Sequence, residues 1–205
     1  MTICFYTEID HQWSEQEFID RLVLLPEKLR QQVLRKRQWK DRQLSIVGKL
    51  LLLRVMKELG SHLKLTDLQY SDYHRPYFNG GPDFNIAHSG NMVVCCGTDK
   101  GNIGIDIEQA KTIELADYND YFTPNEWDKI KEDGFYSFWT RKEAILKAIG
   151  TGFHMPLTSV DVSGESLTYD GITYYLMPLD ISPDYKCHIA TIDATAEVQL
   201  LRLDL

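Results

Sequence analysis

The chain has 205 residues, 43% of them hydrophobic and 25% charged, a composition typical of a globular protein with one or two domains. Its formal net charge of -8 argues against a general nucleic-acid binder, because such proteins usually present a basic surface. The apolar stretch of Leu50–Leu53 with Val55 and Met56 is interrupted by Arg54 and is far too short to span a bilayer, and the acidic start MTICFYTEID does not resemble a secretory signal. We therefore expect a cytoplasmic protein without nucleic-acid or membrane partners.

The cysteines at positions 4, 95, 96 and 187 form no CxxC pair and no metal-ligand spacing. We expect them to be buried thiols in a reducing compartment. The six histidines are scattered without an HxH or HExxH pattern, which argues against a histidine-ligated zinc.

The first half of the chain begins with a strand pattern over 2–9, followed by a helix over 14–24 that Ser14 and Glu17 open as a capping box. A second helix is expected from Pro26 through about residue 40, and a third over 44–59, stopped by Gly60. Short strands are then expected at 68–73, 84–87 and 91–98.

The second half predicts a strand at 103–108, helices at 123–132 and 135–149, and strands at 159–162, 172–177, 186–192 and 198–203. Both halves therefore run in the order strand, helices, strands. We predict an α+β fold of two small α/β-type subdomains, 1–101 and 102–205, with the active site in the cleft between them.

Two acidic residues, Asp106 and Glu108, stand two positions apart in the predicted strand GIDIE. Side chains at i and i+2 project from one face, so the carboxylates lie together while Ile105 and Ile107 face the core. Paired carboxylates suit Mg²⁺ or Mn²⁺, although this short pattern is also typical of a solvent-facing polar stripe.

Glu143 and Lys147 lie one helical turn apart in WTRKEAILK. This spacing fits either an exposed ion pair or a functional pair in which Glu143 binds metal or acts as a base and Lys147 holds a phosphate. His88 and Ser89 follow a short strand and precede Gly90, which fits a phosphate-binding turn as well as an ordinary one.

Basic residues are concentrated between positions 28 and 42, where Asp41 is the only acid between them. They are Lys28, Arg30, Arg35, Lys36, Arg37, Lys40 and Arg42. Charge alone favours a solvated helix face here, with an anion-binding surface as the alternative.

In this order, FNIAHSG, IGIDIE and FWTRKEAILKAIGTGF resemble the signature of the phosphopantetheinyl transferase superfamily, Sfp type, over roughly residues 26–160. The resemblance implies a monomeric pseudo-dimer of two similar subdomains, with coenzyme A in the cleft. It implies transfer of 4'-phosphopantetheine from coenzyme A to a serine of an apo acyl or peptidyl carrier protein, with release of 3',5'-ADP. Two rival readings are a non-catalytic coenzyme A or nucleotide-binding module and a magnesium-dependent phosphodiesterase.

By the same resemblance, Asp106, Glu108 and Glu143 would bind Mg²⁺ (or Mn²⁺) together with the coenzyme A pyrophosphate. Glu143 would also take the proton from the carrier serine. Lys147 would offset charge on the pyrophosphate, and Lys142 would be a second phosphate contact.

At the nucleotide end, the resemblance assigns coenzyme A contacts to Lys28, Ser45, Arg75, His88 and Ser89. This gives the basic stretch a role in anion binding. Two departures weaken the match: Ala87 replaces a family serine, and His74-Arg75-Pro76 replaces Gly-Lys-Pro.

The resemblance has two further implications, for Glu126 and for the segment 111–122. Glu126 matches a family glutamate, but Thr123 and Glu126 also form a capping-box pattern, so we expect it to be structural. The segment 111–122 would face the carrier protein.

Overall fold

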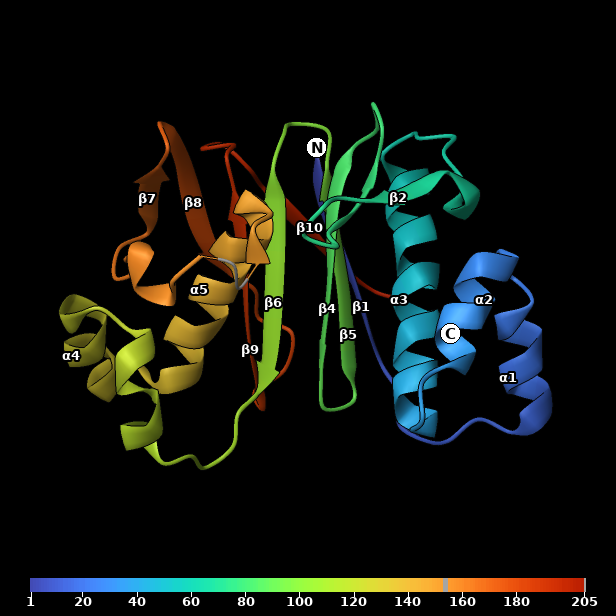
Figure 1. Ribbon diagram of the computed structural model, residues 1–205, viewed down its shortest axis with the longest axis horizontal. Helices are drawn as coiled ribbons and strands as arrows, with labels where there is room; N and C mark the ends of the chain where they lie inside the picture. Colours follow the sequence, from blue (N-terminus) through green and yellow to red (C-terminus); the bar gives the residue numbers. More distant parts are fainter. Residues whose placement is uncertain (153–154, 205) are drawn as a thin grey trace.

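The computed structural model describes residues 1–152 and 155–204. It is a mixed α+β protein with two four-stranded sheets that meet at the centre of the molecule (Figure 1). The last residue of the FWTRKEAILKAIGTGF motif, Phe153, lies outside the described residues. Within the described chain, no helix is both long and apolar enough to cross a membrane.

The N-terminal half contains β1 (Thr2–Glu8), α1 (Glu15–Leu22), α2 (Glu27–Leu34), α3 (Trp39–Glu58), η1 (Leu65–Asp67), β2 (Leu68–Tyr70), β3 (Pro76–Phe78), β4 (Asp83–Ser89) and β5 (Met92–Thr98). The C-terminal half contains β6 (Ile103–Gln109), η2 (Leu115–Tyr121), α4 (Pro124–Asp133), α5 (Phe135–Ile149), η4 (Leu157–Ser159), β7 (Ser166–Tyr169), β8 (Ile172–Pro178), β9 (Tyr185–Thr191) and β10 (Val198–Arg202).

The first sheet has the strand order β10-β1-β5-β4, and the second has the order β6-β9-β8-β7. Strand β10 pairs in parallel with β1, although it comes from the end of the chain. A division at residue 101 falls in the turn between β5 and β6, but it assigns β10 to the half whose sheet it does not join. The C-terminal strand thus ties the two halves together. Whether the halves are related as a pseudo-dimer stays a prediction.

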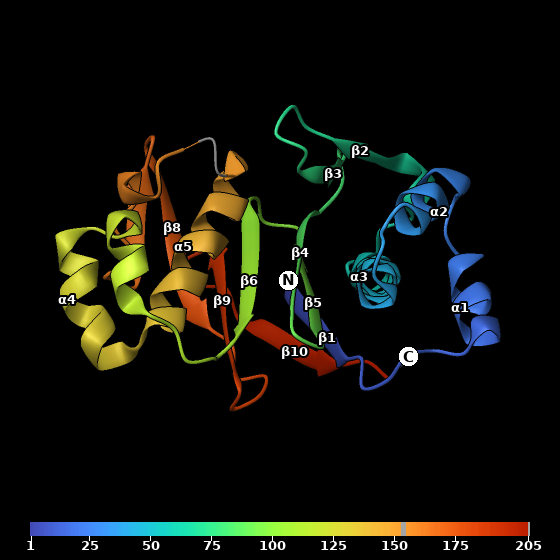
Figure 2. The ribbon, with the colours of Figure 1, turned by 60° about the horizontal axis from the view of Figure 1, so that its bottom comes forward.

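The helices lie on the outer sides of the two sheets (Figure 2). Helix α3 packs its buried residues against the first sheet in a core that includes Leu51, Leu52 and Val55. Helix α5 packs on the second sheet through Phe138, Ile145 and other buried residues. The helices of the two halves therefore approach the central strands from opposite sides.

A third core joins the two sheets, and β4 lies beside β6 there (Figures 1 and 2). The isoleucines Ile103, Ile105 and Ile107 of β6 are fully buried in this core. The alternation predicted for GIDIE is thereby confirmed, because Asp106 lies on the other side of β6 and contacts Lys147 of α5.

Two predicted helix starts are confirmed by their capping boxes, Ser14 with Glu17 and Thr123 with Glu126. Helix α5 ends at Gly150, whose left-handed backbone (φ 88°) suits glycine. All four cysteines are buried and unpaired, as expected.

Two predicted helix bounds and one predicted strand were wrong. Helix α2 ends at Leu34, because the Arg42 guanidinium bonds the Leu34 and Lys36 carbonyls, and α3 then begins at Trp39 rather than near residue 44. Residues 159–162 form no strand, because their backbone groups are bonded by side chains of α4 and α5 instead of by a neighbouring strand.

Candidate active site

Strand β6 and helix α5 are held in close contact at Gly104. A Cβ on Gly104 would lie 2.1 Å from the Ala144 carbonyl oxygen and 2.5 Å from the Ala148 nitrogen. Only glycine allows the helix backbone to approach the strand this closely. The contact sets α5 over β6 so that Glu143 and Lys147 come next to Asp106.

Asp106 and Glu143 are both buried, with exposed fractions of 5% and 8%. Burial raises the pKa of Asp106 to about 6 and that of Glu143 to about 7. The nearby carboxylates add to both shifts, and the Lys147 ammonium opposes them. Asp106, Glu108 and Glu143 therefore lie close enough for each carboxylate to affect the pKa of a neighbour.

Lys147 and Ser89 each hold one of the β6 carboxylates. The Lys147 Nζ lies 2.5 Å from Asp106 Oδ1 and 3.2 Å from the Ile105 carbonyl oxygen. The Ser89 hydroxyl donates to Glu108 Oε2 at 2.5 Å and accepts from the Gln109 amide. Ser89 therefore links β4 to β6 and positions Glu108, in addition to any contact with a ligand.

Two oxygens of the carboxylate cluster are free to bind a metal ion. Asp106 Oδ2 and Glu143 Oε1 are buried and have no hydrogen-bond partner within the described residues. Such unpaired oxygens are costly unless a cation or donor reaches them, and carboxylate oxygens are suitable ligands for Mg²⁺. No three His, Cys, Asp or Glu side chains of the described chain form a complete metal site. Asp106 and Glu143 therefore have the oxygen chemistry that Mg²⁺ prefers, without making a complete metal site on their own.

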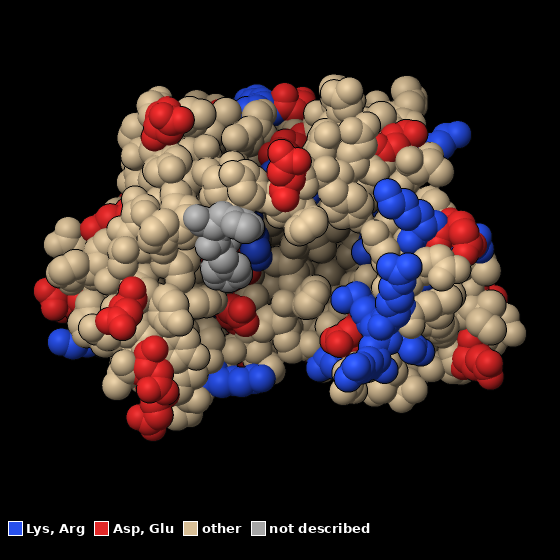
Figure 3. Space-filling model, viewed as in Figure 1, with Lys and Arg blue, Asp and Glu red and all other residues tan. Residues whose placement is uncertain are grey.

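The N-terminal half faces this cluster through the end of strand β4. The side chain of His88 on β4 reaches solvent, but partial desolvation of its ring lowers its pKa, with Lys36 and Lys147 acting in the same direction. Lys36 of the α2–α3 connection and Lys147 of α5 are therefore both near enough to disfavour positive charge on the His88 ring. Basic residues gather over the α2–α3 region beside a hollow in this face of the molecule (Figure 3).

Lys49 is a residue that our sequence reasoning missed. Its Nζ donates to the Ser45 carbonyl and hydroxyl oxygens, each at 3.1 Å. Burial lowers the pKa of Lys49 to about 8, and Lys36 contributes to this shift. The available signal was its position one helical turn after Ser45, on the same face of the predicted helix. Lys28, in contrast, is exposed on α2 with its ammonium 5.9 Å from the Tyr70 ring centroid.

Arg75 bridges the two halves instead of projecting freely into the site. Its guanidinium bonds both oxygens of Asp83 at 2.8 and 2.7 Å, the Ile103 carbonyl at 2.9 Å and the Lys147 carbonyl at 3.0 Å. Most of its donors are therefore already used. Arg75 also lines a hollow of about 510 Å³ with Tyr73, so only its remaining edge is available to a ligand.

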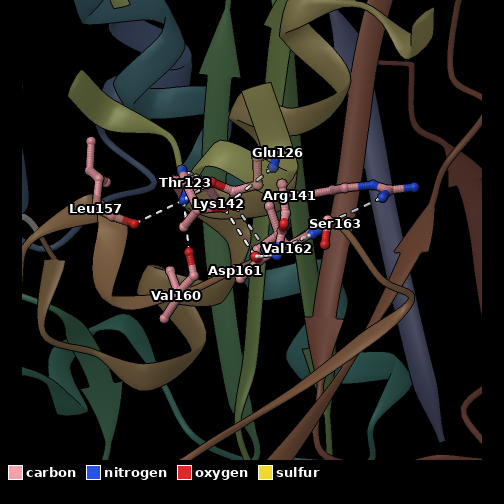
Figure 4. A network of polar contacts seen from close by, with 10 residues as sticks. Thr123, Glu126, Arg141, Lys142, Leu157, Val160, Asp161, Val162 and Ser163 are labelled. Atoms are coloured by element: carbon pink, nitrogen blue, oxygen red, sulfur yellow. Dashed lines mark hydrogen bonds and ion pairs between the residues drawn. The ribbon is translucent and has the colours of Figure 1, made fainter. Parts of the chain in front are cut away.

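Lys142 lies inside the C-terminal half, in a polar network with Glu126, Leu157 and Val160 (Figure 4). Its side chain is 1% exposed, and its Nζ donates to Glu126 Oε2 at 2.8 Å and to the Leu157 and Val160 carbonyls. Three protein acceptors satisfy its three N–H groups. The geometry therefore does not support Lys142 as a phosphate contact, and we assign it to structure.

The expected structural role of Glu126 is confirmed by the same network. Glu126 caps α4 through the Thr123 amide and accepts from the Val162 amide at 2.8 Å. Together with Lys142 it fixes residues 157–162 against α4 and α5. A buried glutamate and lysine thus replace the strand pairing that the sequence suggested for this segment.

The fold and site define a two-sheet α+β protein with a carboxylate and lysine cluster where its halves meet. Residues 102–190 match the model of the 4'-phosphopantetheinyl transferase superfamily. The chain is 30% identical over 190 residues to "4'-phosphopantetheinyl transferase ffp" of Bacillus subtilis, covering 87% of this chain and 81% of that protein. The chain belongs to the 4'-phosphopantetheinyl transferase superfamily.

Two further relatives are of the same kind. Identity is 37% over 140 residues to a "4'-phosphopantetheinyl transferase" of Bacillus subtilis, covering 63% of this chain and 58% of that protein. It is 34% over 142 residues to "4'-phosphopantetheinyl transferase Sfp" of Bacillus subtilis strain 168, covering 64% and 60%. The matched region thus spans about three fifths of these two relatives.

Proposed function

We propose that this protein transfers the 4'-phosphopantetheine group of coenzyme A to a serine of an apo acyl or peptidyl carrier protein, releasing 3',5'-ADP. The observation that carries the proposal is the convergence of Glu143 and Lys147 on the β6 carboxylates, in a member of this superfamily. A pure binding module has no evident need for several buried carboxylates beside a lysine.

In this proposal Asp106, Glu108 and Glu143 would hold Mg²⁺ or Mn²⁺. When bound, the metal supplies electrostatic stabilisation of charge on the pyrophosphate oxygens. Lys147 contributes a second positive charge to the same group. It is already held at this place by Asp106 and the Ile105 carbonyl.

Glu143 would accept the proton of the carrier serine hydroxyl. A carboxylate with a pKa of about 7 and an unpaired buried oxygen is suited to accept a proton at neutral pH. The serine oxygen then forms a bond to the β-phosphorus, and the bond between that phosphorus and the bridging oxygen breaks. The departing group is 3',5'-ADP.

We also propose that His88 and the basic residues of α2 and α3 hold the nucleotide end of coenzyme A. Their support is the positive charge of Lys36, which acts on both Lys49 and His88, while neither lysine forms an ion pair within the described residues. We further propose that the protein acts in the cytoplasm as a monomer, which its four free buried thiols and the inter-sheet core within one chain support.

Intact-mass analysis of a purified apo carrier, incubated with this protein, coenzyme A and Mg²⁺, tests the proposal. A mass gain of one phosphopantetheine, lost when a chelator is added, is expected. Release of 3',5'-ADP without a carrier would indicate a phosphodiesterase. Coenzyme A binding without any mass gain across several unrelated carriers would indicate a binding module, and either result would overturn the proposal.

A further inference from the structure

A hollow of about 580 Å³ lies in the C-terminal half, between the first part of α5, the connection of residues 178–183 and strand β9. We call it the α5–β9 hollow. The described residues that line it do not include Asp106, Glu108, Glu143 or Lys147. Pockets of this size commonly hold small organic ligands. The α5–β9 hollow is therefore a space that the proposed transfer reaction does not use.

Arg141 of α5 lines this hollow, and part of its guanidinium has no bond to the protein. Its Nη1 donates to the Val162 carbonyl at 3.3 Å, and its Nε lies 3.5 Å from Nε2 of His188. Within the described residues, Nη2 has no hydrogen-bond partner and Arg141 forms no ion pair. Its guanidinium extends away from the network of Lys142 and Glu126 (Figure 4). Arg141 can therefore offer charge and donors to a ligand.

Lys186 of β9 supplies a second cation to the same hollow. It is exposed and lies directly opposite Glu108 in the register of β6 and β9. Opposite side chains project from one face of a sheet with Cβ atoms about 5 Å apart. Lys186 nevertheless forms no ion pair with Glu108 or any other acid of the described chain. It lines the α5–β9 hollow together with Arg141.

His188, which also lines the hollow, is held neutral at physiological pH. Burial lowers its pKa to about 3, and the charges of Arg141 and Lys186 act in the same direction. The acids Asp133 and Asp180 line the hollow as well, but neither pairs with these two cations. Two unpaired cations in one hollow favour an anionic ligand. The acids can accept hydroxyl or amine donors from the rest of such a molecule.

We infer that Arg141 and Lys186 bind the phosphate group of a small phosphorylated metabolite in the α5–β9 hollow, at a site separate from the proposed coenzyme A site. Two cations match the charge of a phosphate monoester, which is close to -2 at neutral pH. The planar donors of arginine fit phosphate oxygens, and lysine adds a point charge. The hydroxyl groups of Ser137 and Ser182, which line the same hollow, can donate to the remaining oxygens. This inference goes beyond the proposed function and does not depend on it.

Titration of the ¹⁵N-labelled full chain with inorganic phosphate, followed by NMR with and without saturating coenzyme A, tests the inference. The backbone amides of Ser137, Arg141 and Lys186 should shift saturably in both conditions, and sodium chloride at equal ionic strength should not reproduce the shifts. Arg141→Met and Lys186→Met should each weaken phosphate binding at these amides about tenfold. Lys57→Met, at an exposed position on α3, is the matched control and should leave it unchanged.

Shifts confined to the α2–α3 region, shifts that sodium chloride reproduces, or unchanged affinity in both variants would overturn the inference. Loss of the response when coenzyme A is present would assign the hollow to coenzyme A and would also overturn it. The transfer reaction is tested separately by the carrier assay, so either proposal can fail without the other. Because Lys186 is exposed, Lys186→Met is expected to fold normally and keeps the test decisive if Arg141→Met is unstable.

Discussion

The Lys147 ammonium lies 2.5 Å from one carboxylate oxygen of Asp106, while the other oxygen of Asp106 is buried without a partner. Lys147 therefore pairs with only one of the two oxygens of this carboxylate. Glu143, one turn earlier on α5, likewise has one buried oxygen without a partner. These two oxygens can accept a cation or a hydrogen-bond donor from a bound ligand, which would satisfy them.

Glu143→Gln should abolish transfer while leaving coenzyme A bound. The amide keeps the shape of the side chain but cannot accept the serine proton, so the single-turnover rate should fall about 100-fold or more. Affinity for coenzyme A, measured by calorimetry, should change by less than about threefold. Glu132→Gln, at an exposed position on α4, is the control and should retain full activity. Full activity of Glu143→Gln would remove Glu143 from the mechanism.

Gly104→Ala should destabilise the protein by about 3 kcal/mol, because the new methyl group would press on the backbone of α5 at Ala144. The relevant measurement is the free energy of unfolding in urea. Gly164→Ala is a matched control, since the nearest atom to its added Cβ is the Ser166 carbonyl oxygen at 3.5 Å. Similar stability losses in the two variants would contradict the close approach of β6 and α5.

Lys142→Met should cost about 3–5 kcal/mol of stability, because it leaves the Glu126 charge buried without its partner. Glu126→Gln should have a similar effect, and the double variant should lose less than the sum of the two. In contrast to Lys147→Met, the folded fraction of Lys142→Met should bind coenzyme A normally in calorimetry. A loss of affinity in well-folded Lys142→Met would restore Lys142 as a phosphate contact.

His188 should contribute to acid denaturation. Burial lowers its pKa from 6.5 to about 3, and Thr140 Oγ1 lies 2.7 Å from its Nδ1. Because the folded-state pKa is depressed, the unfolded chain binds the proton first, and stability falls as pH decreases from about 6.5 to 3. The loss should reach about 4 kcal/mol near pH 3.

Urea unfolding at pH 7 and pH 4.5 checks this expectation. His188→Gln removes the titrating group, so its stability relative to the wild type should improve as pH falls. His62→Gln, at an exposed position, should show no such change. An identical pH dependence in the wild type and His188→Gln would exclude His188 as the source of the effect.

Lys49 should reduce stability at neutral pH. With a folded-state pKa of about 8 against an ordinary 10.5, the folded protein binds fewer protons than the unfolded chain, and stability rises with pH between about 8 and 10.5. At pH 7 the free energy of unfolding of Lys49→Met should therefore exceed that of the wild type by about 1 kcal/mol. The variant should accordingly unfold at a higher urea concentration. A destabilised variant would mean that the bonds to Ser45 outweigh the cost of the buried charge.

Much of the local structure could be predicted because its causes are local. The bounds of α5 follow from Gly134 and Gly150, and the starts of α1 and α4 follow from capping boxes. The direction of Asp106 follows from strand alternation alone. Residues 159–162 were misread because alternating valines look alike in a strand and in an extended segment held by side chains.

The sequence by itself determined that Asp106 and Glu108 share one face of a strand and that Glu143 and Lys147 share one face of a helix, because alternation and helical spacing are properties of neighbouring residues. That the two pairs belong to one site was implied only by the family resemblance. Only the tertiary structure distinguished Lys147 from Lys142. The two lie five residues apart on one helix, about 140° around its axis, so only one can face the β6 carboxylates. Packing of α5 on Gly104 decides that this is Lys147, and it buries Lys142 against Glu126 on the other side. Lys36 and Lys147 likewise come near His88 only when the helices of the two halves pack beside β4, since contacts between distant segments are not encoded in local periodicity.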